Sequence, residues 1–194
     1  MNKIICIAGD SASGKTTLAN YLSSNLNNCL IYECDRYHLY ERNNEIWKSF
    51  TQLNYNYNNL ELLREDLIKL KNNIIIERHE YDHSNGTFTK PKTIIPQKYI
   101  IVIGLHTLYD NFKDISDYKI YIDIDNDLKN KWKYERDIKY RNYKKEDCLL
   151  QIDRRKKDFE EFIKFQKNNA DHVLSIGINN NIDELYNKIY LLIK

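Results

Sequence analysis

Two glycines, a lysine and a threonine near the N-terminus have a spacing that can bind phosphate. The stretch "AGDSASGKTT" places four residues between Gly9 and Gly14, and Lys15 and Thr16 follow directly. In this pattern the glycines allow backbone N–H groups to converge on a phosphate at the positive end of a helix. Lys15 is expected to reach the β- and γ-phosphates of ATP, and the Thr16 hydroxyl to hold Mg²⁺. The predicted nucleotide-binding residues are Gly9, Asp10, Ser11, Ala12, Ser13, Gly14, Lys15, Thr16 and Thr17.

A carboxylate and three arginines are candidates for handling a second substrate. Asp35 ends an apolar stretch, and it is expected to take a proton from an acceptor hydroxyl; the alternative is a residue that only turns the chain. Arg42, Arg136 and Arg141 offer the planar fork that fits an anionic acceptor, unless they form an ordinary solvated surface. Arg136 and Arg141 are about 140° apart around a helix, so we expect Arg141 to lie past the helix end in a loop.

Five short apolar segments must position these groups. The predicted strands are residues 3–8, 29–35, 99–104, 118–124 and 171–176. The predicted helices, besides the one that follows the glycine loop, are residues 60–70, 127–140, 145–168 and 182–192. Short apolar strands that alternate with helices predict an α/β fold, a five-stranded parallel sheet with helices on both faces. Ligands of such sheets lie beyond the carboxyl ends of the strands, where the glycine loop and Asp35 are expected.

Residues 74–96 differ from this pattern. Two β-rich runs flank the turn signal Ser84-Asn85-Gly86, which predicts a small antiparallel hairpin that projects from the sheet.

Length and composition predict one domain over residues 1–194. Thirty lysines and arginines stand against 28 aspartates and glutamates, a net charge of +2, so no basic surface for nucleic acid is expected. No apolar stretch approaches the roughly 20 residues of a membrane span, and the short apolar start does not form a leader. The four cysteines lack the spacing of a zinc site, which predicts free thiols in a reducing compartment. We expect a soluble cytoplasmic protein without a nucleic-acid or membrane partner.

Several conspicuous side chains are expected to have structural roles. Trp47 and Trp132 are predicted to be packing residues, and His106 to make a local hydrogen bond. Within residues 153–158, oppositely charged side chains four residues apart favour a solvated helix with ion pairs. Lid contacts with ATP are the alternative for this segment.

The chain resembles the phosphoribulokinase/uridine kinase family of P-loop kinases over nearly all of its length, and the plant-type phosphoribulokinases most. The stretches that carry the resemblance include "GDSASGKTT", "CDRYHLYER", "HEYDHSNGTF", "IGLHTLYD", "KIYIDIDNDLKNKWKYERDIKYRNY" and "IDRRKKDFEEFIKFQKNNADHVL". The last of these has no counterpart in uridine kinases. The extra C-terminal strands of a full phosphoribulokinase are not expected here. The resemblance implies ATP and Mg²⁺ as cofactors, a small-molecule acceptor and, as an open expectation, a homo-oligomer.

The resemblance also implies roles for residues within the matching stretches. The aspartate after the second strand is the base in the family, and the histidine and arginine that follow it bind the sugar phosphate. The family's "RD…R" element supplies further contacts. The implied catalytic residues are Lys15, Asp35 and Asp137, the implied substrate-binding residues are His38, Arg42, Tyr81, Arg136 and Arg141, and the implied metal ligand is Thr16.

One departure from the family concerns the metal. The family has "EGLH" after the third strand, whereas this chain has "IGLH", with Ile103 in place of the acidic residue. An isoleucine cannot bind Mg²⁺, which requires oxygen ligands. Either Asp35, Glu80 or Asp137 takes over this role, or activity is reduced.

The predicted function is ATP-dependent transfer of the γ-phosphoryl group to a hydroxyl of a sugar phosphate, with ribulose 5-phosphate as the first candidate. One alternative is a uridine-type nucleoside kinase. An uncharged nucleoside needs no arginine clamp, so the retained Arg42 and Arg141 argue against it. The other alternative is a non-catalytic nucleotide-binding module, which Ile103 suggests.

Overall fold

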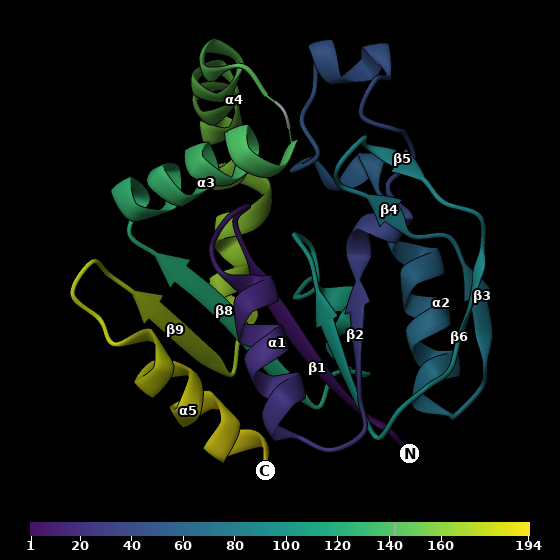
Figure 1. The fold of residues 1–194 in the computed structure, drawn as a ribbon. Helices are drawn as coiled ribbons and strands as arrows, with labels where there is room; N and C mark the ends of the chain where they lie inside the picture. Colours follow the sequence, from purple (N-terminus) through teal and green to yellow (C-terminus); the bar gives the residue numbers. More distant parts are fainter. Residues whose placement is uncertain (142) are drawn as a thin grey trace.

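Five parallel strands form the central sheet of the computed structural model, which describes residues 1–141 and 143–194 (Figure 1). The strands are β1 (Lys3–Gly9), β2 (Cys29–Glu33), β7 (Tyr99–Ile103), β8 (Tyr118–Ile124) and β9 (His172–Ile176). Their order is β2-β7-β1-β8-β9, and all neighbouring pairs run parallel, which confirms the predicted sheet. The second strand ends before the predicted residue 35, because Cys34–Tyr37 forms a 3₁₀ turn.

Side chains of the central strands alternate between two apolar cores, one on each face of the sheet. In β1, for example, Ile4 faces one core and Ile5 the other. The helices are α1 (Lys15–Asn25), α2 (Leu60–Lys71), α3 (Asn126–Arg141), α4 (Lys145–Asp158) and α5 (Ile182–Ile193). Figure 1 shows α1 and α5 over one face, and α2 packs on the core of the other. Each fully buried isoleucine of these cores contributes about 1.5–3 kcal/mol of stabilisation.

The chain after α4 changes its helical pitch twice. A π-helical stretch, Phe159–Ile163, is followed by a 3₁₀ stretch, Lys164–Asn169. The predicted segment 145–168 is therefore helical throughout, but only its first part is an α-helix. Gln166 is fully buried there, and its side-chain amide donates to the carbonyl of Leu105 at 2.7 Å. This hydrogen bond ties the segment to the loop after β7. Within the described ranges, no helix combines the length and the apolar character needed to cross a bilayer.

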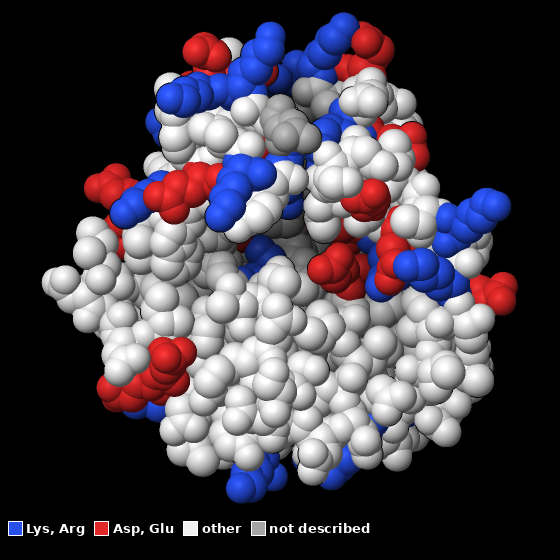
Figure 2. Space-filling view, in the orientation of Figure 1, with Lys and Arg blue, Asp and Glu red and all other residues white. Residues whose placement is uncertain are grey.

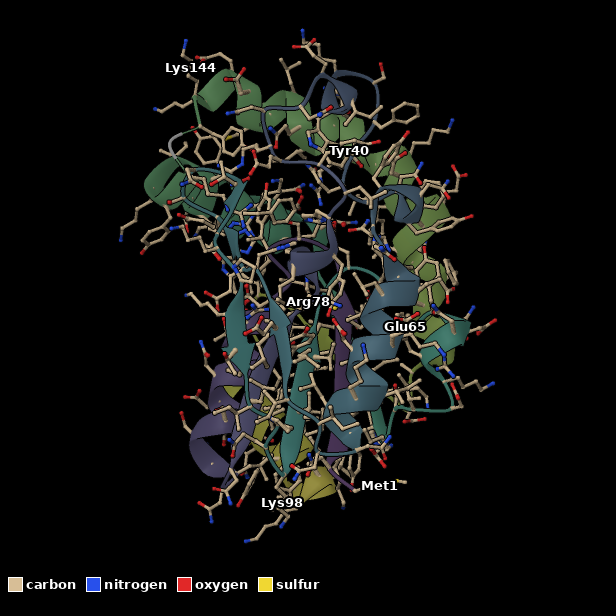
Figure 3. The ribbon with its side chains drawn as sticks, turned by 90° about the vertical axis from the view of Figure 1, so that its right-hand side faces the viewer. Met1, Tyr40, Glu65, Arg78, Lys98 and Lys144 are labelled. Carbon is tan, nitrogen blue, oxygen red and sulfur yellow. The ribbon has the colours of Figure 1, made fainter. Side chains whose placement is uncertain are left out.

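Residues 74–96 form the predicted antiparallel hairpin in two short sections. The strands are β3 (Ile76–Arg78) paired with β6 (Lys92–Ile94), and β4 (Tyr81–Asp82) paired with β5 (Thr87–Phe88). Figure 3 labels Arg78, the last residue of β3. Its Nη2 donates to Oδ1 of the fully buried Asp66 of α2 at 3.0 Å. Tyr37 donates to Oδ2 of the same carboxylate at 2.6 Å. Asp66 therefore joins α2, the base of the hairpin and the 3₁₀ turn that carries Asp35.

Candidate active site

A cavity of about 390 Å³ opens beyond the carboxyl ends of β1, β2 and β7, as expected for a parallel sheet. The predicted site residues that line it are Ser11, Ala12, Ser13, Gly14, Lys15, Thr16, Thr17, Asp35, His38, Arg42, Tyr81, Arg136 and Arg141. The predicted residues Gly9, Asp10 and Asp137 lie outside its lining. Figure 2 shows the mouth as a hollow between α3 and the β4–β5 hairpin, with basic side chains inside it.

Backbone donors at the start of α1, directly after the glycine loop, have no acceptor within that helix. Gly9 and Gly14 have φ values of 146° and 97°, which side chains other than hydrogen rarely allow. α1 begins at Lys15 without a side-chain cap, so the N–H groups of its first turn have no acceptor within the helix. The fully buried hydroxyl of Ser13 also has no hydrogen-bond partner among the residues described. These groups can bind phosphate oxygens.

Lys15 is folded back onto the loop that carries it. Its Nζ donates to the carbonyl of Gly9 at 3.0 Å and to that of Asp10 at 2.6 Å. Burial lowers the pKa of Lys15 to about 8, although the carboxylates of Asp10 and Asp35 act in the opposite direction. The ammonium is therefore mostly charged at pH 7, and it lines the cavity where a phosphate would bind.

Asp10 supports the loop from behind. Its Oδ2 lies 3.0 Å from Nζ of Lys129 in α3, and its Oδ1 lies 4.0 Å from Nη2 of Arg155 in α4. Burial raises the pKa of this carboxyl, but the two cations outweigh burial, so the net pKa lies below the usual value. Asp10 thus holds the loop against two helices instead of facing the cavity.

Asp35 lies in the 3₁₀ turn after β2 and contacts two histidines. Its Oδ1 is 3.5 Å from Nε2 of His38, and its Oδ2 is 3.3 Å from Nε2 of His83. Burial raises the pKa of Asp35, but the two histidines and the positive charges of Lys15 and Arg141 outweigh burial and lower it overall. The carboxylate is therefore ionised at neutral pH and can accept a proton.

The β4–β5 hairpin holds Arg42 at the edge of the cavity. Gly86 at the hairpin turn has a φ of 80°, and a Cβ there would lie 2.3 Å from Cβ of Arg42, so only glycine allows this approach. The Arg42 guanidinium donates to the carbonyl of His83 at 2.6 Å. Tyr81 of β4 packs edge-on against His38, with ring centroids 5.2 Å apart. The hairpin and the chain after the 3₁₀ turn therefore form one wall.

Asp137 is a buried anion that gathers the basic side chains of α3. It pairs with Lys133 one turn earlier, accepts from Nη2 of Arg136 at 2.7 Å and lies 3.7 Å from Nη1 of Arg141. Burial raises the pKa of Asp137, but the charges of Lys133 and Arg136 outweigh burial. The net pKa therefore lies below the usual value, and the carboxylate stays charged. Arg141 is the last residue of α3, so its predicted position in a loop is wrong. Both arginines reach the cavity because their long side chains meet at Asp137, which itself positions them without lining the cavity.

The cavity also contains polar residues that the sequence pattern did not single out: Glu33, Gln52, His83, Lys133, Tyr143 and Gln151. Two of these residues could have been identified from their spacing in the sequence. His83 follows Tyr81 by two residues, and such residues share a face of a strand. Lys133 precedes Asp137 by four, the spacing of an ion pair on a helix. No sequence spacing could have identified Glu33, because its place in the cavity depends on the register between two strands.

The ion pairs predicted within residues 153–158 at a spacing of four are wrong. Arg154 donates instead to the carbonyl of Lys48 at 2.6 Å, and Asp158 accepts from Thr51 Oγ1 at 2.6 Å. Arg155, between them in sequence, lines the cavity. This part of α4 therefore packs against the chain of residues 47–51 and faces the candidate nucleotide site.

Three other residues were predicted to have structural roles. All three pack within the fold, but two of them differ from the prediction in detail. Trp47 packs against Tyr57 at a centroid distance of 5.6 Å. Trp132 packs on the α1 core but also lines the cavity. His106 is buried, and its Nε2 lies 3.4 Å from the carbonyl of Gln52, so its hydrogen bond is not local. Burial lowers the pKa of His106 to about 3, which keeps it neutral.

Ile103 lines the cavity at the end of β7, so the carboxylates around it determine how a cation could bind. Of the three predicted substitutes, Asp35 lines the cavity, whereas Asp137 is held by α3. Glu80 lies outside it, where it accepts from Arg36 at 3.1 Å and pairs with Lys92. Over the described part of the chain, no three His, Cys, Asp or Glu side chains gather into a metal site. A cation would therefore need oxygen atoms from a ligand as well.

Comparisons with known proteins agree with this geometry. The family model described as "Phosphoribulokinase / Uridine kinase family" matches residues 4–183. The phosphoribulokinase of Synechocystis is 33% identical over 176 residues, which cover 89% of this chain and 53% of that protein. The uridine kinase of Macrococcus caseolyticus is 32% identical over 200 residues, which cover 98% and 97%. The chain spans about half the length of the curated phosphoribulokinases that it matches.

Two solved structures share the fold. The phosphoribulokinase from Rhodobacter spheroides has a TM-score of 0.73 at 19% identity, over 95% of this chain and 74% of that one. A D-glycerate 3-kinase from Cryptococcus neoformans has a TM-score of 0.62 at 12% identity, over 93% and 87%. At these identities the likeness concerns the fold alone.

Proposed function

The chain belongs to the phosphoribulokinase/uridine kinase family, and we propose that it transfers the γ-phosphoryl group of ATP to a hydroxyl of a small phosphorylated sugar. One observation carries this proposal: the glycine loop, the ionised Asp35 and several basic side chains line the same cavity. A kinase needs these three parts, a phosphate cradle, a proton acceptor and a binding site for the acceptor molecule.

The residues of the loop fit a nucleotide with its magnesium ion. The unpaired donors of the first turn of α1 and the Ser13 hydroxyl suit phosphate oxygens, and Lys15 supplies the opposite charge. The hydroxyl of Thr16, also in the cavity lining, is an oxygen ligand of the kind that Mg²⁺ prefers. When bound, the ion neutralises charge on the phosphate oxygens.

The proposed roles of the other residues follow from their contacts. Asp35 takes the proton of the acceptor hydroxyl as that oxygen forms its bond to the γ-phosphorus and the bond to ADP breaks. The residues proposed to hold the acceptor are His38, Arg42, Tyr81, Arg136 and Arg141. Asp137 positions the arginines of α3. Charges that are partly buried in the cavity attract one another more strongly than they would in bulk water.

A phosphorylated acceptor, with ribulose 5-phosphate as the first candidate, is favoured by charge. Arg42 and Arg141 stand with Asp35 on the acceptor side, and a phosphate can receive charge-assisted hydrogen bonds from both. A nucleoside is the second candidate, because the match to a uridine kinase extends over nearly that whole protein. A non-catalytic nucleotide-binding module is the third candidate, because Ile103 occupies the position where the family has a carboxylate.

The four cysteines support a reducing, cytoplasmic location as part of the same proposal. All four are free thiols in the structure, and three of them are buried. Burial raises the pKa of Cys6 to about 12, so that thiol stays protonated and unreactive.

An ADP-release assay with a panel of acceptors tests the proposed function. The panel holds ribulose 5-phosphate, other pentose phosphates, uridine, cytidine and a reaction without acceptor. We expect turnover with a pentose phosphate, and Asp35→Asn should lower kcat by about 10²–10⁴ without loss of ATP binding. Turnover with uridine alone would favour the nucleoside kinase, and ATP binding without turnover on any acceptor would favour the non-catalytic module.

A further inference from the structure

The ends of two neighbouring strands face the candidate nucleotide site with different chemistry. β7 ends at Ile103 and β2 ends at Glu33, and these two residues are register partners in the parallel pair. Partnered residues of adjacent strands point to the same face of a sheet, about 4.8 Å apart. Both residues line the cavity. A carboxylate is therefore present one strand away from the aliphatic side chain, on the same face.

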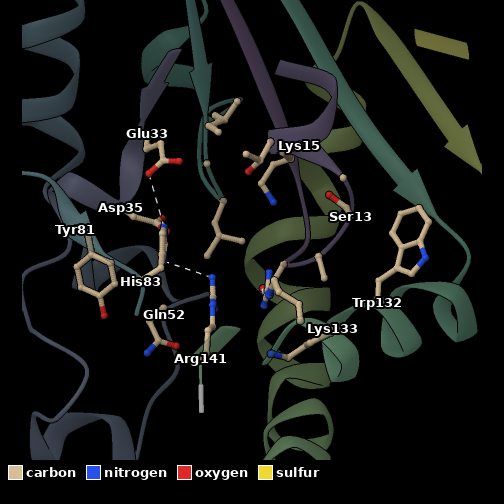
Figure 4. Close-up of a pocket in the computed structure, with 18 of the residues that line it drawn as sticks. Ser13, Lys15, Glu33, Asp35, Gln52, Tyr81, His83, Trp132, Lys133 and Arg141 are labelled. Atoms are coloured by element: carbon tan, nitrogen blue, oxygen red, sulfur yellow. Dashed lines mark hydrogen bonds and ion pairs between the residues drawn. The ribbon is translucent and has the colours of Figure 1, made fainter. Parts of the chain in front are cut away.

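Glu33 is the acidic side chain of the cavity that no cation holds closely. Within the described ranges, the acidic residues that line the cavity are Glu33 and Asp35. The ion pair of Glu33 there is a 3.7 Å contact with Nε2 of His83, which lies nearer to Asp35. Its side chain is 35% exposed. Figure 4 shows Glu33 and Asp35 on one side of the pocket, opposite Lys15 and Ser13.

A separate observation indicates that an anionic ligand belongs in this cavity. The Ser13 hydroxyl is fully buried in the loop and lacks a partner among the described residues. Cations from three elements line the opposite walls, among them Lys15, Lys133 and Arg155. A phosphate chain satisfies these donors, and a divalent cation bound to that chain needs acidic oxygen ligands in turn.

We propose that Glu33 supplies the carboxylate that supports the magnesium ion of bound ATP, directly or through a coordinated water, in place of the acid that Ile103 cannot provide. The inference rests on the proposed function. Mg²⁺ is usually held by one or two carboxylates together with phosphate oxygens and waters. With Glu33 in this role, Asp35 keeps its lone pairs for the acceptor proton. The two carboxylates of the cavity thus have separate tasks.

Metal binding can be measured apart from catalysis. Mn²⁺ replaces Mg²⁺ as a paramagnetic probe, and its binding to the full chain in the presence of ADP is followed by electron paramagnetic resonance. We expect Glu33→Gln to leave the affinity for metal-free ADP unchanged and to weaken Mn²⁺ binding to the ADP complex by roughly tenfold to a hundredfold. Glu65→Gln, on the exposed face of α2, is the matched control and should behave like the parent chain.

A double variant provides the second arm. Glu33→Gln combined with Ile103→Glu moves the carboxylate back by one strand, so Mn²⁺ affinity should recover. Thermal unfolding of each variant, compared with the parent, confirms that the fold is kept. Unchanged Mn²⁺ affinity in Glu33→Gln, with a loss in Asp35→Asn, would overturn the inference and assign the metal to Asp35. A parent chain that binds no nucleotide at all would instead overturn the proposed function on which the inference rests.

Discussion

Nε2 of His83 lies 3.3 Å from Oδ2 of Asp35, and Nδ1 of the same ring lies 3.4 Å from Nη2 of Arg141. An arginine can only donate, so in the neutral ring Nδ1 accepts from Arg141, and Nε2, on the Asp35 side, then carries the ring hydrogen. One imidazole from the β4–β5 hairpin therefore connects the candidate base with the end of α3. This contact crosses the cavity from one wall to the other.

His83→Gln should move the acid limb of the pH profile of kcat/KM to higher pH. His83 is one of the groups that lower the pKa of Asp35, so its removal raises that pKa, and a higher pH is then needed to ionise the base. The measurement is kcat/KM for the acceptor between pH 5 and 9, at saturating ATP. His79→Gln, a histidine outside the cavity lining, is the control. An acid limb at the same pH in the parent and His83→Gln would contradict this role.

ATP binding should weaken as the pH rises above about 8. The charged form of Lys15 binds phosphate, and its pKa in the free protein is about 8, so the Kd should rise about tenfold between pH 7 and pH 9. Calorimetry at both pH values gives this ratio. Lys133 has a pKa of about 8 as well, because burial lowers it.

Two variants distinguish these lysines. Lys15→Arg keeps its charge throughout this range, so whatever affinity it retains should not fall between pH 7 and pH 9. Lys133→Met should keep the tenfold loss. The reverse outcome would assign the pH dependence to Lys133.

Arg42→Ala or Arg141→Ala should raise the KM for a phosphorylated acceptor by roughly tenfold to a hundredfold. Each variant loses a charge-assisted hydrogen bond of about 1.5–3 kcal/mol, while the KM for ATP should change little. Arg64→Ala removes an arginine that pairs with Asp114 outside the cavity, and it serves as the control. An unchanged acceptor KM in both variants, with uridine as the substrate, would favour the nucleoside kinase.

Asp66→Ala should lower the free energy of unfolding by about 2–4 kcal/mol. The substitution leaves Tyr37 and Arg78 without their shared acceptor beneath the hairpin. Arg78 is 25% exposed, so water partly replaces the lost contact. Urea unfolding measures the difference, and Glu65→Ala on the exposed neighbour should stay within about 0.5 kcal/mol of the parent. A similar loss in both variants would show that the buried carboxylate has no special role.

The strands and the glycine loop could be predicted because their signals are local. β7 is a continuous run of buried β-branched and aromatic residues, and the loop is defined by the spacing between Gly9 and Gly14. The pitch changes after α4 could not be predicted. They occur in a segment where Gln166 bonds to a residue 61 positions away in sequence, a contact that no local pattern indicates. A regular helical pattern predicts continuation until a tertiary contact overrides it.

The residues of the candidate site likewise divide into those that the sequence could predict and those that it could not. Most residues that belong to a motif, such as Lys15 and Asp35, line the cavity as predicted, whereas Gly9, Asp10 and Asp137 lie outside its lining. The position of Arg141 was wrong because an angle around an ideal helix ignores the reach of a long side chain, which bends toward Asp137. Glu33 reaches the site only through its pairing with Ile103, and strand register between segments 70 residues apart is not written in either segment alone.

The two carbonyl contacts of Lys15 compete with any phosphate ligand for the same ammonium group. A molecule that binds there must offer the ammonium more than the carbonyls of Gly9 and Asp10 already do. A triphosphate or diphosphate carries enough charge to make this exchange favourable, whereas a nucleoside without phosphate offers no gain. We therefore expect the loop to prefer a phosphorylated ligand before any contact with the base or the sugar is made.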